Sequence, residues 1–282
     1  MSFGRHQSFY LKKHWINKGI KALSMNNDSI FISKEGFKYL GIGKNMQQSL
    51  RYWLEATNIA KHNSINKNHS LTHFGELIKK YDSACSSPFS LTLVHYFLVN
   101  SRENNQPFSH TFNWFFLINA DSYITKEKMK EMLKGYSPVT AENTINKDID
   151  CLFQTYTNYE KKHPEDKNIS LLADLYLLKK DKHIYYKTTL ELNNETIPAV
   201  YYALYANRKE FSLTVENITK YIGSIFNFNR TQVIDVIEKL IEKNYPISLT
   251  RTNNLDTVII RDVGLDNDVL AKLFFEVFDH EA

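Results

Sequence analysis

The chain has 282 residues, of which 43% are hydrophobic and 23% are charged, and its formal net charge is +4. This balance excludes a disordered or fibrous chain and is typical of a globular protein with two or three modules. Only 9 glycines and 6 prolines are present, which favours a mainly helical protein with few tight turns.

The ends of the chain and its apolar runs predict a cytoplasmic protein. Residues 1–20 are polar and basic rather than an apolar leader. The apolar stretch 114–118 is far shorter than the ~20 residues that a membrane helix needs. Cys85 and Cys151 lie far apart and fit neither a disulfide framework nor a zinc-site pattern.

Positive charge is concentrated at the start of the chain. Residues 1–80 contain 13 lysines and arginines against 4 aspartates and glutamates, whereas the remainder contains 22 against 27. Such asymmetry favours a polyanionic partner for the basic part. The alternative is that these charges form the solvated face of an ordinary domain.

The first module, residues 1–87, is predicted to be a basic winged helix that binds DNA. Apolar residues at helical spacing predict a helix over 10–23, and Ser33 is expected to cap a short helix after it. A glycine turn at 41–43 leads into a second helix over 44–57, because glycine adopts backbone conformations that other residues resist.

The helix predicted over 44–57 is amphipathic. Its apolar positions form one buried stripe: Met46, Leu50, Trp53 and Leu54. Sparse alternation over 59–71 then predicts a β-wing, and 74–81 a further short helix. Helix, glycine turn, helix and wing are the parts of a winged helix-turn-helix.

Two further modules are predicted, so the fold class is mainly α with small β-wings, in tandem winged-helix or helix-turn-helix-like modules. Residues 88–160 are predicted to be a helix-turn-helix-like module, wholly helical over 88–157, with Thr125 and Thr140 capping its pair of helices. Residues 161–282 are predicted to form an α+β winged-helix-like module beyond a charged linker over 158–168. Its elements are strands over 169–178 and 183–189, helices capped by Thr214 and Asn229, a hairpin around Asn253 and Asn254, and a closing helix from Asp266.

Three sets of polar side chains are candidate nucleic-acid contacts, because cations hold phosphates and amides or cations read base edges. The first set lies on the helix over 44–57: Lys44, Asn45, Gln47, Gln48 and Arg51. The second set lies in the N-terminal segment: Arg5, His6, Lys12, Lys13, His14 and Lys18. The third set lies in the second module: Asn143, Thr144 and Lys147. The alternative is that these side chains form the solvated surface of a winged helix that binds another protein.

No catalytic or metal-binding residue is assigned from the sequence. Hydrolysis of DNA normally needs acidic residues that hold a divalent metal. Asp148 and Asp150 followed by residues 160–162 loosely imitate an Asp…Glu-x-Lys nuclease core, but they fall in a predicted helix and linker rather than on paired strands. Glu165 and Asp166 could also bind a metal, but a surface charge cluster is the commoner explanation.

Four stretches together resemble a known bacterial family. They read GRHQSFYLKKHWINKGIKAL from Gly4, LGIGKNMQQSLRYWLEAT from Leu40, AENTINKDIDCLFQTY from Ala141 and HPEDKNISLLADLYLL from His163. They resemble the SspB-type DNA nickase family, a domain-of-unknown-function family encoded beside PAPS-reductase-like sulfurtransferases in DNA phosphorothioation loci. The resemblance spans nearly the whole chain, and the family's opening glycine–histidine pair corresponds here to Gly4 and His6 with Arg5 inserted.

The resemblance implies a DNA-binding subunit of a phosphorothioation defence system that nicks duplex DNA so that sulfur can enter one strand. It implies a metal-dependent endonuclease that uses Mg²⁺ or Mn²⁺, but it transfers no catalytic residue. The implied partners are DNA, a cysteine desulfurase, a sulfurtransferase and an ATPase. A homodimer is a further possibility. The alternatives are a non-catalytic recognition subunit or repressor, and a protein–protein scaffold in the same complex.

Overall fold

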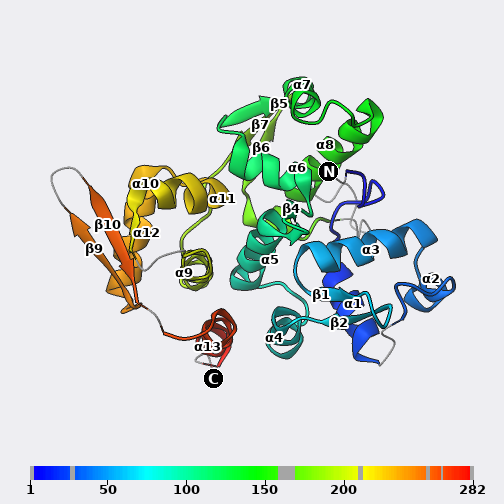
Figure 1. Cartoon of the computed structure of the whole chain (residues 1–282), viewed down its shortest axis with the longest axis horizontal. Helices are drawn as coiled ribbons and strands as arrows, with labels where there is room; N and C mark the ends of the chain where they lie inside the picture. Colours follow the sequence, from blue (N-terminus) through cyan, green and yellow to red (C-terminus); the bar gives the residue numbers. More distant parts are fainter. Residues whose placement is uncertain are drawn as a thin grey trace.

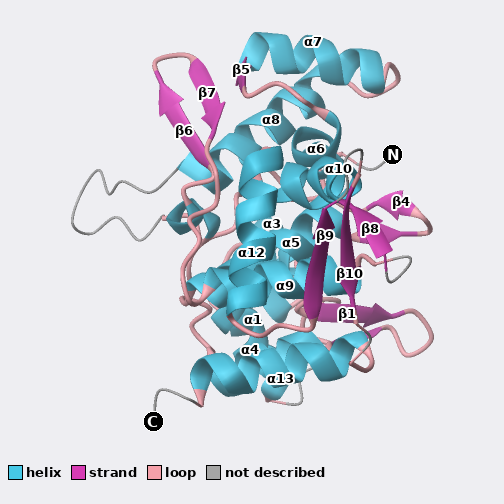
Figure 2. Cartoon of the chain, turned by 90° about the vertical axis from the view of Figure 1, so that its left-hand side faces the viewer, coloured by secondary structure: helices cyan, strands magenta, loops and turns pink. Residues whose placement is uncertain are grey.

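Helices form most of the fold, and small antiparallel sheets lie at its edges (Figures 1 and 2). The computed structural model describes residues 3–25, 29–157, 169–208, 212–251, 255–261 and 263–279. The mainly α class with small β elements is therefore confirmed. None of the helices in these ranges is both long enough and apolar enough to cross a membrane.

The first unit follows the predicted order of elements. It consists of α1 (Trp15–Ser24), α2 (Gly36–Leu40), α3 (Lys44–Ala56), the hairpin β1 (Ala60–Asn63) and β2 (Asn68–Leu71), and α4 (His73–Tyr81). Gly41 ends α2 with a φ of +61°, the left-handed conformation that a glycine turn was expected to supply. Ser33 does not cap a helix, because α2 begins three residues later with Glu35 before it.

The second and third units share one topology. The second contains β5 (Tyr123–Thr125), α7 (Lys126–Tyr136), α8 (Glu142–Thr157), β6 (Leu178–Asp181) and β7 (Ile184–Lys187). The third contains β8 (Ser212–Thr214), α10 (Val215–Ile218), the π-helix η3 (Thr219–Gly223), α11 (Ser224–Phe226), α12 (Arg230–Glu242), β9 (Ile247–Arg251) and β10 (Asp256–Ile260). The sheets run β5-β7-β6 and β8-β10-β9, so in each the short first strand pairs with the last strand of the hairpin.

Most of the predicted helix caps in these two units are present. The side chains of Thr125, Thr214 and Asn229 each accept a hydrogen bond from a backbone amide in the first turn of α7, α10 and α12. The cap predicted at Thr140 is wrong, because α8 begins at Glu142 and the Thr140 hydroxyl pairs with that of Ser137.

Central helices join the three units. They are α5 (Pro88–Asn100), α6 (His110–Asn113), the π-helix η1 (Trp114–Ile118), the 3₁₀ helix η2 (Leu172–Leu175) and α9 (Thr196–Ala206), with α13 (Asp266–Phe278) closing the chain. Ten of the thirteen α5 residues are buried. The region 88–157 is not wholly helical, because β3 (Arg102–Glu103) pairs with β4 (Gln106–Pro107) and β5 joins a sheet.

The predicted module boundaries do not separate independent cores. β5 and β7 lie on opposite sides of the boundary at residue 160 and pair with each other. At the other boundary, the ring of Phe274 in α13 packs against Phe89 in α5 and Phe74 in α4. One hydrophobic core therefore runs through all three predicted modules. The linker over 158–168, residues 160–162 and the turn at Asn253 and Asn254 lie outside the described residues.

A close approach at Gly75 fixes the position of α4. A Cβ added at Gly75 would lie 2.1 Å from the carbonyl oxygen of Ile59, so that backbone leaves no room for a side chain. We expect Gly75→Ala to destabilise the fold by about 1–3 kcal/mol, as overpacking does. The matched control is Gly135→Ala in exposed α7, where nothing lies within 4 Å and alanine should stabilise the helix by up to about 1 kcal/mol. Urea denaturation of both variants checks this, and equal stabilities would contradict it.

Candidate nucleic-acid interface

One face of α3 carries a stripe of polar side chains. Lys44, Gln48, Arg51 and Glu55 follow at spacings of four, three and four, which places them on one face of the helix. Lys44 is exposed, and Gln48 and Arg51 are half-buried. Within the described chain, the side chains of Lys44, Gln48 and Arg51 neither hydrogen-bond nor ion-pair. We call these three residues, with exposed Asn45 beside them, the α3 stripe.

Gln47 does not belong to the α3 stripe, although the sequence places it on the same side of the helix. Its side chain is 4% exposed, and its amide nitrogen donates to the carbonyl oxygens of Ile30 at 2.7 Å and Ser33 at 3.1 Å. The amide therefore holds the loop before α2 against α3 and cannot reach a base edge.

His6 is also buried, in a polar cluster beneath the N-terminal segment. Its Nε2 lies 2.9 Å from Asp148, whose carboxylate also accepts from the Gly4 backbone amide and the Thr111 hydroxyl. Burial alone would lower the pKa of His6, but neighbouring Cys151 and the Asp148 carboxylate outweigh burial and raise the pKa to about 10. His6 is therefore a charged structural residue that ties the N-terminal segment to α8, not a phosphate contact.

Arg5 is engaged with acidic groups rather than free for phosphate. Its guanidinium lies 2.8 Å from Glu103 and 3.8 Å from Glu55 at the end of α3. Its central carbon also sits 3.7 Å from the centre of the Phe108 ring. Arg5 can contact a phosphate, as expected from the sequence, only by giving up these interactions.

The other cations of the N-terminal segment lie around α1 and have partners of their own. Lys13 pairs with Asp174 at 2.7 Å, and Lys18 donates to the carbonyl oxygen of Leu40 at 2.8 Å. Half-buried Lys12 lies over the Phe9 and Trp15 rings, and burial lowers its pKa. His14 is exposed. Lys13 contacts the 169–175 segment, whereas Lys18 contacts the end of α2 before the turn into α3. These cations therefore do not form one continuous surface.

The third predicted set lies at the start of α8. Asn143 and Lys147 are exposed, and Thr144 is half-buried next to Gly4. Because Gly4 and His6 bind Asp148 on this helix while Arg5 binds Glu55, residues 4–6 bridge α8 and the end of α3. Helix α3 and the first turns of α8 therefore lie on either side of the same short segment (Figure 1).

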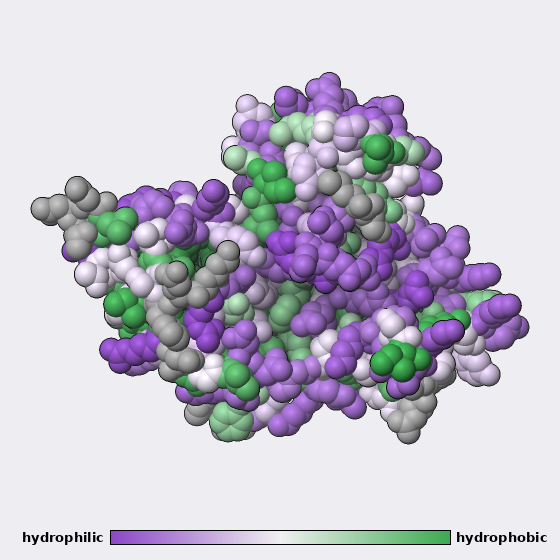
Figure 3. Space-filling model, in the orientation of Figure 1, coloured by the Kyte–Doolittle hydropathy of each residue, from purple (hydrophilic) through white to green (hydrophobic). Residues whose placement is uncertain are grey.

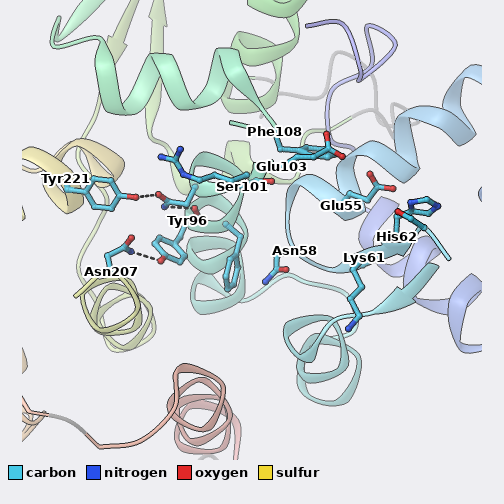
Figure 4. A pocket seen from close by; sticks show the side chains of 15 residues that line it. Glu55, Asn58, Lys61, His62, Tyr96, Ser101, Glu103, Phe108, Asn207 and Tyr221 are labelled. Atoms are coloured by element: carbon cyan, nitrogen blue, oxygen red, sulfur yellow. Dashed lines mark hydrogen bonds between the residues drawn. The ribbon is translucent and has the colours of Figure 1, made fainter. Parts of the chain in front are cut away.

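A polar cleft of about 590 Å³ begins where the α3 stripe ends. The side chains of Asn58, Lys61 and His62 lie on one side of it, and those of Tyr96, Asn207 and Tyr221 lie on the other (Figure 4). The face shown in Figure 3 is hollowed between its lobes and largely hydrophilic around the hollow. The sequence did not reveal this cleft, because its walls come from α3, β1, α5, β3 and η3.

Cationic side chains at the cleft outnumber its carboxylates. Glu55 is held by His69 at 2.8 Å and by Arg5, and Glu103 is held by the same guanidinium. Exposed Lys61 and Arg102 have no ion pair or hydrogen bond through their side chains among the described residues. With Arg5 there are three cationic side chains against the two carboxylates, an excess of one positive charge, which favours an anionic ligand.

The described residues do not present a metal site. No group of three or more histidine, cysteine, aspartate or glutamate side chains in the described ranges is placed to hold a metal ion. The two cleft carboxylates, Glu55 and Glu103, are bridged by the Arg5 guanidinium, which occupies the space where a cation between them would sit. We therefore assign none of the described residues to metal binding.

Fold and surface together define a mainly helical protein with small antiparallel sheets and a polar, cation-bearing face. A profile described as "Protein of unknown function (DUF4007)" matches residues 3–274, and the chain belongs to this family. A search of curated protein sequences found no significant match.

Two solved structures share the fold over almost the whole chain. One, described as "SspB crystal structure", has a TM-score of 0.84 and 19% sequence identity, covering 99% of this chain and 88% of the other. The other, described as "Magnesium ion-bound SspB crystal structure", has a TM-score of 0.83 and 20% identity with the same coverage. The SspB-type family assignment made from the sequence is thus confirmed, and at this identity the likeness establishes the fold.

Proposed function

We propose that the chain is a DNA-binding protein of a bacterial DNA phosphorothioation system. The observation that carries this proposal is the α3 stripe, whose cations and amides point outward without partners in the described chain, on a fold shared with SspB. Unpartnered lysine and arginine side chains on a helix face are suited to phosphates, and amides beside them to base edges. Exposed Asn143 and Lys147 on α8, on the other side of residues 4–6, are proposed as further contacts.

The topology of the units supports a winged-helix interpretation. In the second and third units a short strand precedes the helices, a hairpin follows them, and the strand pairs with that hairpin. The first unit has the glycine turn, the outward-facing helix α3 and the β1–β2 hairpin. In such modules the helix after the turn enters the major groove, so we propose α3 as the recognition helix.

Nicking of duplex DNA in the presence of Mg²⁺ or Mn²⁺ is the second part of the proposal. It is supported by the resemblance to the nickase family and by the likeness to a magnesium-bound SspB structure. A cysteine desulfurase, a sulfurtransferase and an ATPase are the proposed partners in the same system. No residue is assigned to catalysis.

A supercoiled plasmid tests the enzymatic part. With Mg²⁺ or Mn²⁺ we expect the purified protein to convert supercoiled circles to relaxed ones, and EDTA to prevent this. A gel-shift assay on the same plasmid reports binding separately. Binding without relaxed circles at any metal concentration would remove the nickase and leave the second candidate, a non-catalytic recognition subunit, which the lack of a carboxylate cluster in the described chain favours.

A further inference from the structure

The cleft at the end of the α3 stripe has features that duplex binding does not explain. Its volume of about 590 Å³ lies within the range of small-molecule sites and is far too small for a double helix. It is polar, and its lining residues come from 55–64, 96–108 and 207–221. None of them was a candidate contact from the sequence. We propose that this cleft binds an unpaired DNA nucleotide, and the proposal rests on the DNA binding inferred above.

The charges of the cleft fit a phosphate-bearing ligand. The Arg5 guanidinium pairs with both Glu55 and Glu103, and His69 hydrogen-bonds to Glu55, so neither carboxylate is without a partner. Together with Lys61 and Arg102, the cleft has one cationic side chain more than it has carboxylates. Lys61 extends from β1 on one wall and Arg102 from β3 near the other. Both are exposed, and their side chains have no hydrogen-bond or ion-pair partner in the described chain, so each can hold a backbone phosphate.

Two amides of the cleft keep hydrogen-bonding capacity for a base edge. Half-buried Asn58 has no side-chain partner among the described residues. Asn207 uses its amide nitrogen on the Tyr96 hydroxyl at 2.5 Å and the Ala203 carbonyl at 2.7 Å, which leaves its oxygen as an acceptor. Unpaired bases expose both donors and acceptors on their Watson–Crick edges, and these edges are hidden in a duplex.

Aromatic rings of the same cleft can stack on a base. Phe97 and Tyr221 are half-buried and line the cavity. Tyr221 is held in place by the hydrogen bond of its hydroxyl to Asn100 (Figure 4). Proteins that bind single strands combine such rings with a cationic track, because every base has a face that stacks.

The cleft is continuous with the proposed duplex contact. Glu55 lies on the same face of α3 as Lys44 and Arg51, and it also lines the cleft. Lys44 and Glu55 are eleven residues apart, which corresponds to about 16 Å along the helix axis. A strand that leaves a duplex held on α3 would therefore reach the cleft without crossing another domain.

A short fluorescent single-stranded oligonucleotide tests the cleft directly. The test variant is Asn58→Gly with Arg102→Ala. Glycine keeps the positive φ of +57° at position 58, so the variant removes the amide without straining the backbone. The matched control is Lys67→Ala, an exposed cation in the turn between β1 and β2 that does not line the cleft. We expect the test variant to lose about tenfold in single-strand affinity, and the control less than about twofold.

A blunt duplex with the same label separates this inference from the proposed function. The cleft variant should bind the duplex as wild type does, because the α3 stripe is intact. Equal single-strand affinity for the cleft variant and wild type would overturn the nucleotide site, as would no single-strand binding at all. If wild type binds the single strand through the cleft but ignores the duplex, the nucleotide site stands and the duplex-binding function fails.

Discussion

Asp148→Asn is expected to destabilise the protein by about 3–5 kcal/mol, the usual cost of removing one partner of a buried ion pair. His6 and Asp148 have side chains that are 3% and 7% exposed, and they lie 2.9 Å apart. The substitution leaves a buried imidazole without its counter-charge and also weakens the bonds from Gly4 and Thr111. Urea denaturation at pH 7 measures the change.

The matched control is Asp150→Asn, two residues further along α8. Asp150 pairs with Lys126 at the surface, where its side chain is 48% exposed, so its loss should cost less than about 1 kcal/mol. If the free energy of unfolding of Asp148→Asn lies within 1 kcal/mol of that of wild type, the buried pair contributes little to stability.

The same pair predicts a pH dependence of stability. The pKa of His6 is raised from 6.5 to about 10 in the folded protein, so the folded state holds its proton more tightly than the unfolded chain does. The stabilisation is fully present below pH 6.5 and is lost as the pH rises through about 10. Wild type should therefore lose stability between pH 6.5 and 9, and Asp148→Asn should lose less.

The second large effect is expected at the α3 stripe. Replacing Lys44 and Arg51 together by alanine should weaken duplex binding roughly 25-fold near physiological salt, about fivefold for each lost phosphate contact. Both side chains lack partners in the described chain, so we expect thermal stability to stay unchanged. Lys79→Ala is the control, because this exposed lysine pairs with Glu76 on α4, away from the stripe. Fluorescence anisotropy with a labelled duplex measures the affinities, and equal weakening in the control would contradict a specific contact.

The elements with strong local signals could be predicted from the sequence. The α3 helix was expected over 44–57 and is found over Lys44–Ala56, because its apolar spacing and the glycine turn before it are local features. The caps at Thr125, Thr214 and Asn229 are local for the same reason. The pairing of β5 with β7 was missed, since its three-residue strand carries little pattern and its partner lies about sixty residues later.

The candidate site was predicted only where exposure follows from helix periodicity. Lys44, Gln48 and Arg51 lie outward as expected, whereas Gln47 is covered by the loop carrying Ile30 and Ser33. His6 is buried because its ring pairs with the carboxylate of Asp148, which is 142 residues away in the sequence. The cleft needs residues from five elements, and no single stretch of sequence contains its pattern.

The central claim is that the α3 stripe binds DNA phosphates. The salt dependence of duplex binding tests this claim most directly. Affinities of wild type and of the Lys44→Ala, Arg51→Ala double variant would be measured between 50 and 200 mM KCl. We predict a steep loss of affinity for wild type and a slope about two units shallower for the double variant, since two phosphate contacts are gone. Identical slopes for the two proteins would contradict phosphate binding by these residues.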